Sequence, residues 1–258
     1  MNRVAVKIAY LGEHFSGSQI QPGFRTVEGD VLSDVMMITN MKDEEVDLKI
    51  ASRTDRGVNS LGNVAVFNSN ISDPDILLRA LNAVSKDVFY RSVALVDNEF
   101  NPRFANMREY RYVLRSDGLD IPAMRCCAAL FSGEHDFTRF CKPNGRSATL
   151  VLNRIHVHEE GCMVILDFSA RYFLWNMIRR IVAAMISVGR GDSSLSDVED
   201  ALCGKDVTFG IARPDALTLL DVCYWGIEFT APSADVFDKR IEEELFKDRL
   251  KGMFFASL

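Results

Sequence analysis

Residues 49–67 of the chain read Lys-Ile-Ala-Ser-Arg-Thr-Asp-Arg-Gly-Val-Asn-Ser-Leu-Gly-Asn-Val-Ala-Val-Phe. Just before the polar part of this stretch, residues 46–50 alternate apolar and polar side chains, which predicts a half-buried strand. Residues 64–67 are apolar and begin a second strand. We therefore expect a polar loop between two strands, an arrangement that can fix a reactive side chain in place.

The loop carries one carboxylate between two cations, Asp55 between Arg53 and Arg56. Two glycines, Gly57 and Gly62, allow backbone angles that other residues avoid. Taken alone, Arg-Thr-Asp-Arg-Gly reads as an ordinary turn, because Asp and Gly are common turn residues. A functional interpretation therefore depends on the rest of the chain.

The composition is that of a globular protein with room for one large domain or two small ones. Of the 258 residues, 48% are hydrophobic and 26% are charged. No apolar run approaches the roughly 20 residues of a membrane span. The first residues enter a strand pattern at once, which leaves no room for a signal peptide. We expect a cytoplasmic protein that does not bind a membrane.

The cysteines and histidines give little sign of a metal site. The six cysteines form no Cys-x-x-Cys pair, and we expect reduced, mostly buried thiols. His156 and His158 alternate on a predicted strand and could form half of a zinc site. A structural or surface role is the better interpretation, because no Cys or carboxylate pair lies nearby at ligand spacing.

The net charge of −6 is unevenly distributed along the chain. Residues 1–105 carry 11 basic and 14 acidic groups, residues 106–190 carry 12 and 8, and residues 191–258 carry 7 and 14. The overall acidity argues against non-specific binding of nucleic acid. A basic middle is compatible with a polyanion bound at one place.

Apolar periodicity and turn residues predict the order of the elements. In the first half we expect strands at 3–10, 46–50, 64 onward and 88–96, and helices at 26–40 and 73–81. In the second half we expect strands at 108–115, 150–158, 162–169 and 217–229, helices at 172–188 and from Phe237, and a short helix that a Ser196–Glu199 capping box begins and Gly204 ends.

This order is the split βαβ pattern of ferredoxin-like units. We predict an α+β fold of two ferredoxin-like or RRM-like units, residues 1–105 and 106–258. A continuous, mostly antiparallel sheet should join them, with helices on one face and the active cleft on the other.

The helix at 172–188 has the strongest apolar stripe of the chain. At about 100° per residue, Arg179 and Arg180 fall on opposite flanks of this stripe. Only one of the two guanidinium groups is therefore expected to reach a given cleft.

Several blocks of the sequence resemble the TruA-type tRNA pseudouridine synthases. Residues 52–60, Ser-Arg-Thr-Asp-Arg-Gly-Val-Asn-Ser, are similar to the family's Gly-Arg-Thr-Asp-x-Gly-Val-His-Ala. Residues 10–19 resemble its Tyr-x-Gly-x-x-Phe-x-Gly-Trp-Gln, and 173–182, Phe-Leu-Trp-Asn-Met-Ile-Arg-Arg-Ile-Val, match a block of its second half. Ser18 and Asn59 stand where the family has Trp and His. Further similar blocks lie at 26–29, 100–112 and 133–140, and an archaeal-like variant lies at 212–217.

The resemblance implies an enzyme that isomerises uridine to pseudouridine in the anticodon stem-loop of tRNA, around positions 38–40, without a cofactor. Asp55 matches the catalytic aspartate, which acts either as a nucleophile or as the base that removes a ribose proton. Arg179 matches the arginine that pairs with it, and Tyr110 matches the tyrosine that stacks on the target base. Arg53 could hold the loop or a phosphate. The family also implies a homodimer.

Basic residues of the middle region are candidates for phosphate contact. They are Arg103, Arg108, Arg111, Arg139, Lys142 and Arg146, and two residues of the opening block, Phe15 and Gln19, are further candidates for substrate binding.

Two other functions stay open. Ferredoxin-like units often bind RNA without catalysis, although the chain lacks the aromatic RNP signature and such a module would not need Asp55. A metal hydrolase built on His156 and His158 would lose its activity to chelators.

Overall fold

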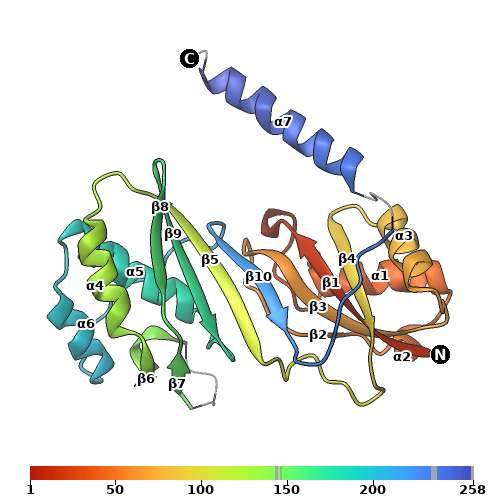
Figure 1. Cartoon of the computed structure of the whole chain (residues 1–258), viewed down its shortest axis with the longest axis horizontal. Helices are drawn as coiled ribbons and strands as arrows, with labels where there is room; N and C mark the ends of the chain where they lie inside the picture. The colour runs from red at the N-terminus through yellow and green to blue at the C-terminus, as the bar shows by residue number, and fades with distance from the viewer. Residues whose placement is uncertain (143–144, 146, 234–236, 257–258) are drawn as a thin grey trace.

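The computed structural model describes residues 1–142, 145, 147–233 and 237–256. One sheet runs through the molecule in the order β4-β1-β3-β10-β5-β9-β8, and β2 pairs with β3 beside this path (Figure 1). The strands are β1 (Asn2–Tyr10), β2 (Lys49–Ile50), β3 (Asn59–Ser69), β4 (Val88–Leu95), β5 (Met107–Arg115), β8 (His156–Glu160), β9 (Met163–Ala170) and β10 (Leu217–Cys223). β6 (Gly133–Asp136) and β7 (Thr149–Leu152) form a separate hairpin.

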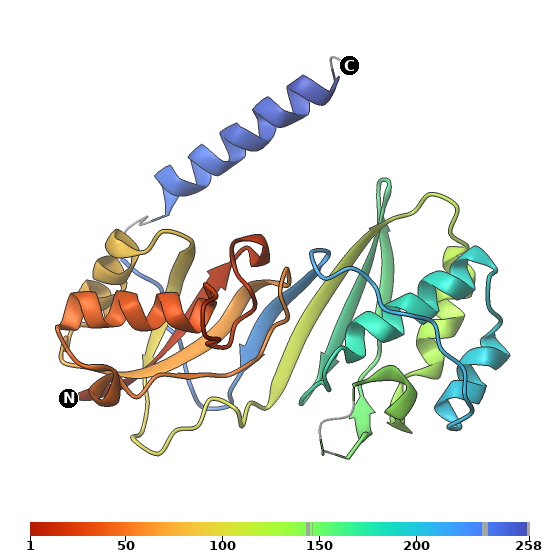
Figure 2. The same ribbon diagram turned by 180° about the vertical axis from the view of Figure 1, so that it is seen from behind.

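Helices cover one face of this sheet, as the view from behind shows (Figure 2). They are α1 (Val27–Thr39), α2 (Asp43–Val46), α3 (Pro74–Val84), α4 (Ile121–Leu130), α5 (Met177–Arg190) and α6 (Leu195–Leu202), with the 3-10 turns η1 (Gly12–His14) and η2 (Thr138–Phe140). α7 (Asp238–Ala256) extends away from the sheet. The predicted α+β fold is confirmed, whereas the boundary between residues 105 and 106 stays a prediction.

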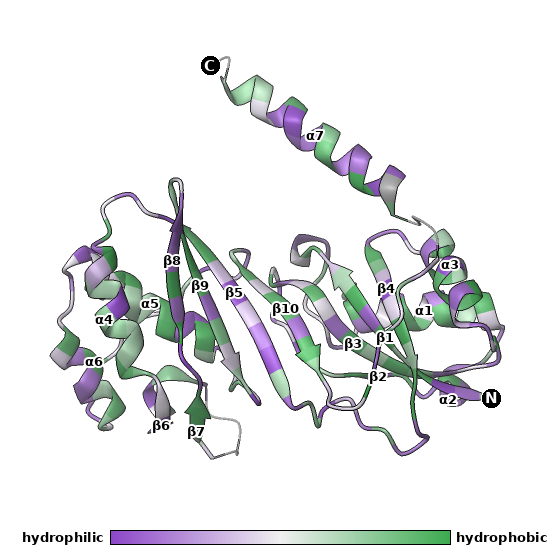
Figure 3. Ribbon diagram, in the orientation of Figure 1, coloured by the Kyte–Doolittle hydropathy of each residue, from purple (hydrophilic) through white to green (hydrophobic). Residues whose placement is uncertain are grey.

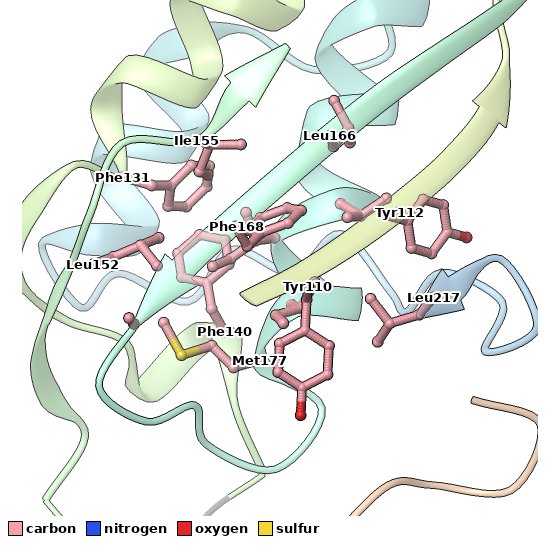
Figure 4. Close-up of a cluster of buried hydrophobic side chains, with 14 of the residues drawn as sticks. Tyr110, Tyr112, Phe131, Phe140, Leu152, Ile155, Leu166, Phe168, Met177 and Leu217 are labelled. Atoms are coloured by element: carbon pink, nitrogen blue, oxygen red, sulfur yellow. The ribbon is translucent and has the colours of Figure 1, made fainter. Parts of the chain in front are cut away.

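Two apolar clusters fasten the helices to the sheet. In the first half, β1 packs under α1 and α3 through Val4, Val6, Ile8, Val31, Val35 and Leu78. In the second half, β5 and β9 pack under α4 and α5 through Tyr112, Leu166, Phe168, Met124, Met177 and Ile181 (Figure 4). Burial of apolar surface of this extent is the main stabilising term of the fold.

The strand at the second-half edge of the sheet, β8, is largely hydrophilic (Figure 3). It contains both histidines that the sequence singled out, and it ends in two glutamates. Charged side chains on an edge strand discourage pairing with another chain. The composition of β8 therefore suits its place at the edge.

The structure corrects several predicted boundaries. Only Lys49–Ile50 of the strand expected at 46–50 is a strand, because Asp43 to Val46 form α2 and Asp47 adopts the left-handed conformation at φ 45°. Ser194, not Ser196, begins α6: its hydroxyl accepts a hydrogen bond from the Asp197 N–H, and the Asp197 carboxylate accepts one from the Ser194 N–H. The last strand ends at Cys223 rather than at 229.

Three further elements were not expected from the sequence, namely α4, β6 and η2. α4 begins at the N-cap Asp120, whose carboxylate accepts a hydrogen bond from the Ala123 N–H, and it has Pro in its first turn. β6 and η2 lie between residues 133 and 140, where no helix or strand was expected. In addition, α5 begins only at Met177, because Asn176 is left-handed at φ 62°.

The two halves of the sheet meet where β3 lies parallel to β10, with Asn59 opposite Thr218 and Ser60 opposite Leu219. Every other strand pair described in this sheet is antiparallel. β3 bulges at this point, because Ile8 pairs with Asn63 but Tyr10 pairs with Ser60. A bulge re-aims the side chains that follow it.

Gly62 lies in this bulge and lets the two strands approach. A Cβ atom at Gly62 would lie 2.6 Å from the Leu220 carbonyl oxygen and 2.7 Å from Asp221 Oδ1. Both distances are shorter than real Cβ contacts, so any larger residue would push β10 away from β3.

We expect Gly62→Ala to lower the free energy of unfolding by about 1–3 kcal/mol, the usual scale for overpacking. Gly252→Ala is the matched control, because a Cβ there meets no atom within 4 Å and lies in the exposed helix α7. Thermal unfolding followed by circular dichroism measures both. Equal melting temperatures for the two variants would contradict the close contact between β3 and β10.

Candidate active site

The loop between β2 and β3 is held by a buried polar network around Thr54. The Thr54 N–H donates to Ser18 Oγ at 2.8 Å, and the Ser18 N–H donates to the Thr54 carbonyl at 3.0 Å. The hydroxyls of Tyr10 and Thr54 share a hydrogen bond of 2.9 Å. Ser18 is only 1% exposed. In this chain, the serine that replaces the family's tryptophan therefore fixes the residue before Asp55.

A second set of bonds fixes Ser52 at the start of the loop. Asn63 donates to the Ser52 carbonyl at 2.8 Å and accepts from its N–H at 3.1 Å. Arg108 Nε donates to Ser52 Oγ at 2.9 Å, and its other nitrogens donate to the carbonyls of Ala51, Arg103 and Arg171. Arg108 is 7% exposed, and its hydrogen bonds link β5 to residues 51–52, Arg103 and Arg171 inside the protein.

The end of the loop also depends on close contacts. Gly57 has φ +84°, a conformation that favours glycine. A Cβ on Gly12 would lie 2.4 Å from the Gly57 carbonyl carbon, so η1 sits directly against the loop. Asn59 accepts from the Gly12 N–H and donates to the Asp215 carbonyl, both at 2.9 Å. The residue at the family's histidine position thus joins η1 to the segment before β10.

Asp55 pairs with the arginine that the helix register and the resemblance selected. Arg179 Nη1 lies 3.1 Å from Asp55 Oδ2, and Arg179 Nε donates to the Ala212 carbonyl at 2.8 Å. The side chains are 15% and 32% exposed, respectively. Arg180 is not among the partners of Asp55 in the described part of the chain. The structure therefore brings together Asp55 and Arg179 across 124 positions of sequence.

Trp175 is a site residue that the sequence did not indicate. Its indole Nε1 donates to Asp55 Oδ1 at 3.1 Å, the carboxylate oxygen that Arg179 does not contact. Lys142 Nζ lies 4.0 Å from the centre of the indole ring. The only signal in the sequence is its position four residues before Arg179.

Tyr110 lies on β5 next to these residues and is 7% exposed. Its ring meets Phe173 edge to face at 5.2 Å, and Figure 4 shows its hydroxyl directed away from the apolar cluster. Burial raises the pKa of the Tyr110 phenol, an effect that the nearby charge of Arg108 partly opposes. The phenol is therefore neutral at ordinary pH.

These side chains lie on the face of the sheet that the helices cover. Tyr110 shares its face of β5 with Tyr112, which packs in the same cluster as Met177 of α5. Arg179 extends from α5 itself. The site residues therefore lie on the same side of the sheet as α5, and the place of the cleft that admits a substrate stays a prediction.

The remaining predicted substrate residues occupy different environments. Arg53, Gln19 and Arg103 are exposed, and together with Ser18, Glu28 and Ile50 they line a small pocket. Phe15 is 3% exposed and packs against Tyr10 and under Arg25, so it belongs to the core.

The other basic candidates mostly have partners within the protein. Arg111 makes two hydrogen bonds to the Asp167 carboxylate, and Arg139 contacts Asp206 and the Gly204 carbonyl. Lys142 is exposed and lies on Trp175. Arg146 lies outside the described residues.

The described residues contain neither a cluster of metal ligands nor a helix suited to span a membrane. No group of three or more His, Cys, Asp or Glu side chains is arranged there to hold a metal ion. No helix among those residues is both long and apolar enough to cross a membrane.

The chain is similar to known proteins over nearly its whole length. A family described as "tRNA pseudouridine synthase" matches residues 127–225. "tRNA pseudouridine synthase A" of Pyrococcus abyssi is 38% identical over 257 residues, covering 98% of this chain and 96% of that protein. The protein of the same name from Thermococcus sibiricus is 40% identical over 232 residues, covering 88% and 86%.

A solved archaeal box H/ACA sRNP Nop10–Cbf5 complex is a much weaker match, with a TM-score of 0.36 and 12% identity over 71% of this chain and 43% of that one. That likeness is too distant to support an argument. The sequence relatives are sufficient to show the family of this chain, because their similarity covers most of both chains at more than a third identity. The chain belongs to the tRNA pseudouridine synthase A family.

Proposed function

We propose that this protein isomerises uridine to pseudouridine in tRNA, with Asp55 as the catalytic carboxylate. The observation that carries the proposal is the ion pair of 3.1 Å between Asp55 and Arg179, with Tyr110 beside it, from three distant parts of the sequence. The names of the relatives in archaea support the substrate class.

The reaction breaks the bond between ribose C1′ and uracil N1 and forms a bond from C1′ to C5. Asp55 assists the detachment, either by attacking C1′ or by removing a ribose proton. Arg179 donates a hydrogen bond to one oxygen of the carboxylate and fixes its direction. Tyr110 supplies a ring for stacking on the uracil, and its neutral phenol can take part in the proton transfer at C5.

The target uridine must leave its stack to reach Asp55, which costs a few kcal/mol. The pocket lined by Arg53, Gln19 and Arg103 is a suitable place for the neighbouring phosphates, because two exposed guanidinium groups meet there. Lys142 and Arg139 are further candidates for RNA contact. Arg108 and Phe15 act on the substrate indirectly, by holding the loops that meet it.

The resemblance supports four finer points of the proposal. The uridines lie around positions 38–40 of the anticodon arm, the enzyme acts as a homodimer, and it works in the cytoplasm. The reaction has no net redox change, and the resemblance implies that it proceeds without a cofactor or a metal ion.

Asp55→Asn should abolish pseudouridine formation, because the amide keeps the shape of the side chain but can neither attack nor accept a proton as a carboxylate does. Release of tritium from tRNA labelled at uridine C5 measures turnover, and a filter-binding assay measures affinity, which should survive. Asp117→Asn is the control, since Asp117 is an exposed aspartate that pairs with Arg115. Turnover by Asp55→Asn would refute the assignment. A wild-type protein that binds tRNA but releases no tritium would indicate a noncatalytic RNA-binding module.

Arg179→Ala should lower kcat on the order of 10²-fold, the scale expected when a reacting group loses its fixed position. Arg180→Ala, one residue further along α5, should turn over close to wild type, because Arg179 makes the contact with Asp55. Steady-state kinetics on tRNA, with melting temperatures to check folding, compare the two. An equal or larger loss at Arg180 would mean that Asp55 and Arg179 do not work together.

Tyr110→Phe keeps the ring, so tRNA affinity should be unchanged, and its kcat tests whether the hydroxyl takes part in the chemistry. The raised pKa keeps the wild-type phenol neutral beyond its ordinary value of about 10. Ionisation of Tyr110 should therefore cause no fall in kcat between about pH 7 and pH 10. A basic limb in that range that is present in the wild type and absent from Tyr110→Phe would contradict this.

A further inference from the structure

We infer that Trp175 is a positioning residue for the catalytic carboxylate, an inference that rests on the function proposed for Asp55. Trp175 Nε1 donates to Oδ1 and Arg179 Nη1 donates to Oδ2, each at 3.1 Å. A single donor would leave the carboxylate free to rotate, because this terminal torsion is soft. Two donors on the two oxygens define its plane.

The backbone before α5 brings the two donors to the same carboxylate. Asn176 lies between them in the left-handed conformation, at φ 62° and ψ 6°, which asparagine tolerates better than most residues. The turn at Asn176 takes Trp175 out of the helix that Arg179 belongs to. The Asn176 side chain also accepts from Arg179 Nη1 at 3.4 Å.

The indole of Trp175 is also held by Lys142, from the segment that follows η2. Lys142 Nζ lies 4.0 Å from the ring centre, and the Lys142 N–H donates to the Trp175 carbonyl at 2.8 Å. A cation over the face of an indole is an attractive arrangement. Trp175 is nevertheless 45% exposed, so part of the ring borders the solvent beside Asp55.

The indole N–H is neutral, so it orients the carboxylate without adding a second positive charge to the pair. Loss of this donor should therefore reduce the rate of the chemical step and leave RNA affinity unchanged. An exposed tryptophan could instead stack on a base of the RNA. In that case its loss would weaken binding, and the two roles differ in whether kcat or KM changes.

The test uses a chain in which position 175 carries the only tryptophan. The sequence contains two, and Trp225 is 85% exposed, so Trp225→Phe serves as the active parent. In this parent, Trp175 is replaced by phenylalanine, or by 3-benzothienylalanine, which keeps the bicyclic shape and lacks the N–H. The second replacement separates the lost donor from lost packing.

Both replacements should lower kcat by roughly 3- to 30-fold, below the full effect of a hydrogen bond to a charged group because water can reach this half-exposed site. KM and the Kd for tRNA should equal those of the parent. Unchanged kcat, a loss with phenylalanine alone, or a change confined to KM would overturn the inference. A wild-type protein that binds tRNA and releases no tritium would instead overturn the proposed function, and the inference with it.

Discussion

The arrangement of the site depends on the parallel pairing of β3 with β10. Only two residues of each strand are in register there, Asn59 with Thr218 and Ser60 with Leu219. Asn59 follows the Asp55 loop directly, and Ala212, which receives Arg179 Nε, lies five residues before β10 begins. Parallel strands require a long crossover connection. Here the crossover contains β5 and α5, and it therefore delivers Tyr110 and Arg179 to the loop that carries Asp55.

The site consequently belongs to neither half of the chain alone. Asp55 comes from the first half, whereas Tyr110, Trp175 and Arg179 come from the second. Arg108 strengthens the connection, since this residue of β5 donates to Ala51 and Ser52 of the loop. Displacement of the two halves by even 1 Å would lengthen the contacts to Asp55, and misplacement of that size lowers rates steeply.

The parts of the fold that could be predicted are those with strong local signals. Thr26 and Asp73 accept backbone hydrogen bonds at the starts of α1 and α3, as the sequence indicated. The positions of Arg179 and Arg180 on opposite flanks of the helix could also be predicted, because they follow from local helix geometry. By contrast, α4 has a weak apolar stripe rich in Ala and Cys, and residues 46–50 alternate like a strand although acidic residues just before them favour a helical turn.

Long-range partners could not be predicted, because no local rule specifies them. The contact between Trp175 and Asp55 spans 120 positions of sequence. A count of basic residues could not show that Arg108 is buried against carbonyls while Arg53 and Arg103 stay exposed. The sequence also did not indicate on which side of β5 the helix α5 packs.

Two kinds of contact build the site around Asp55: neutral hydrogen bonds to the backbone of the loop, and an ion pair on the carboxylate. Buried neutral groups, from Tyr10, Ser18 and Asn63, hold the backbone just before it, at Ser52 and Thr54. Such groups satisfy each other's hydrogen-bonding needs when they are buried. The cation is placed on the carboxylate itself, at a position where both partners keep some exposure, 15% for Arg179 and 32% for Asp55. A fully buried ion pair would have a larger desolvation cost and would leave no path for a substrate. A rigid neutral frame with one partly exposed ion pair therefore keeps the carboxylate oriented and accessible at the same time.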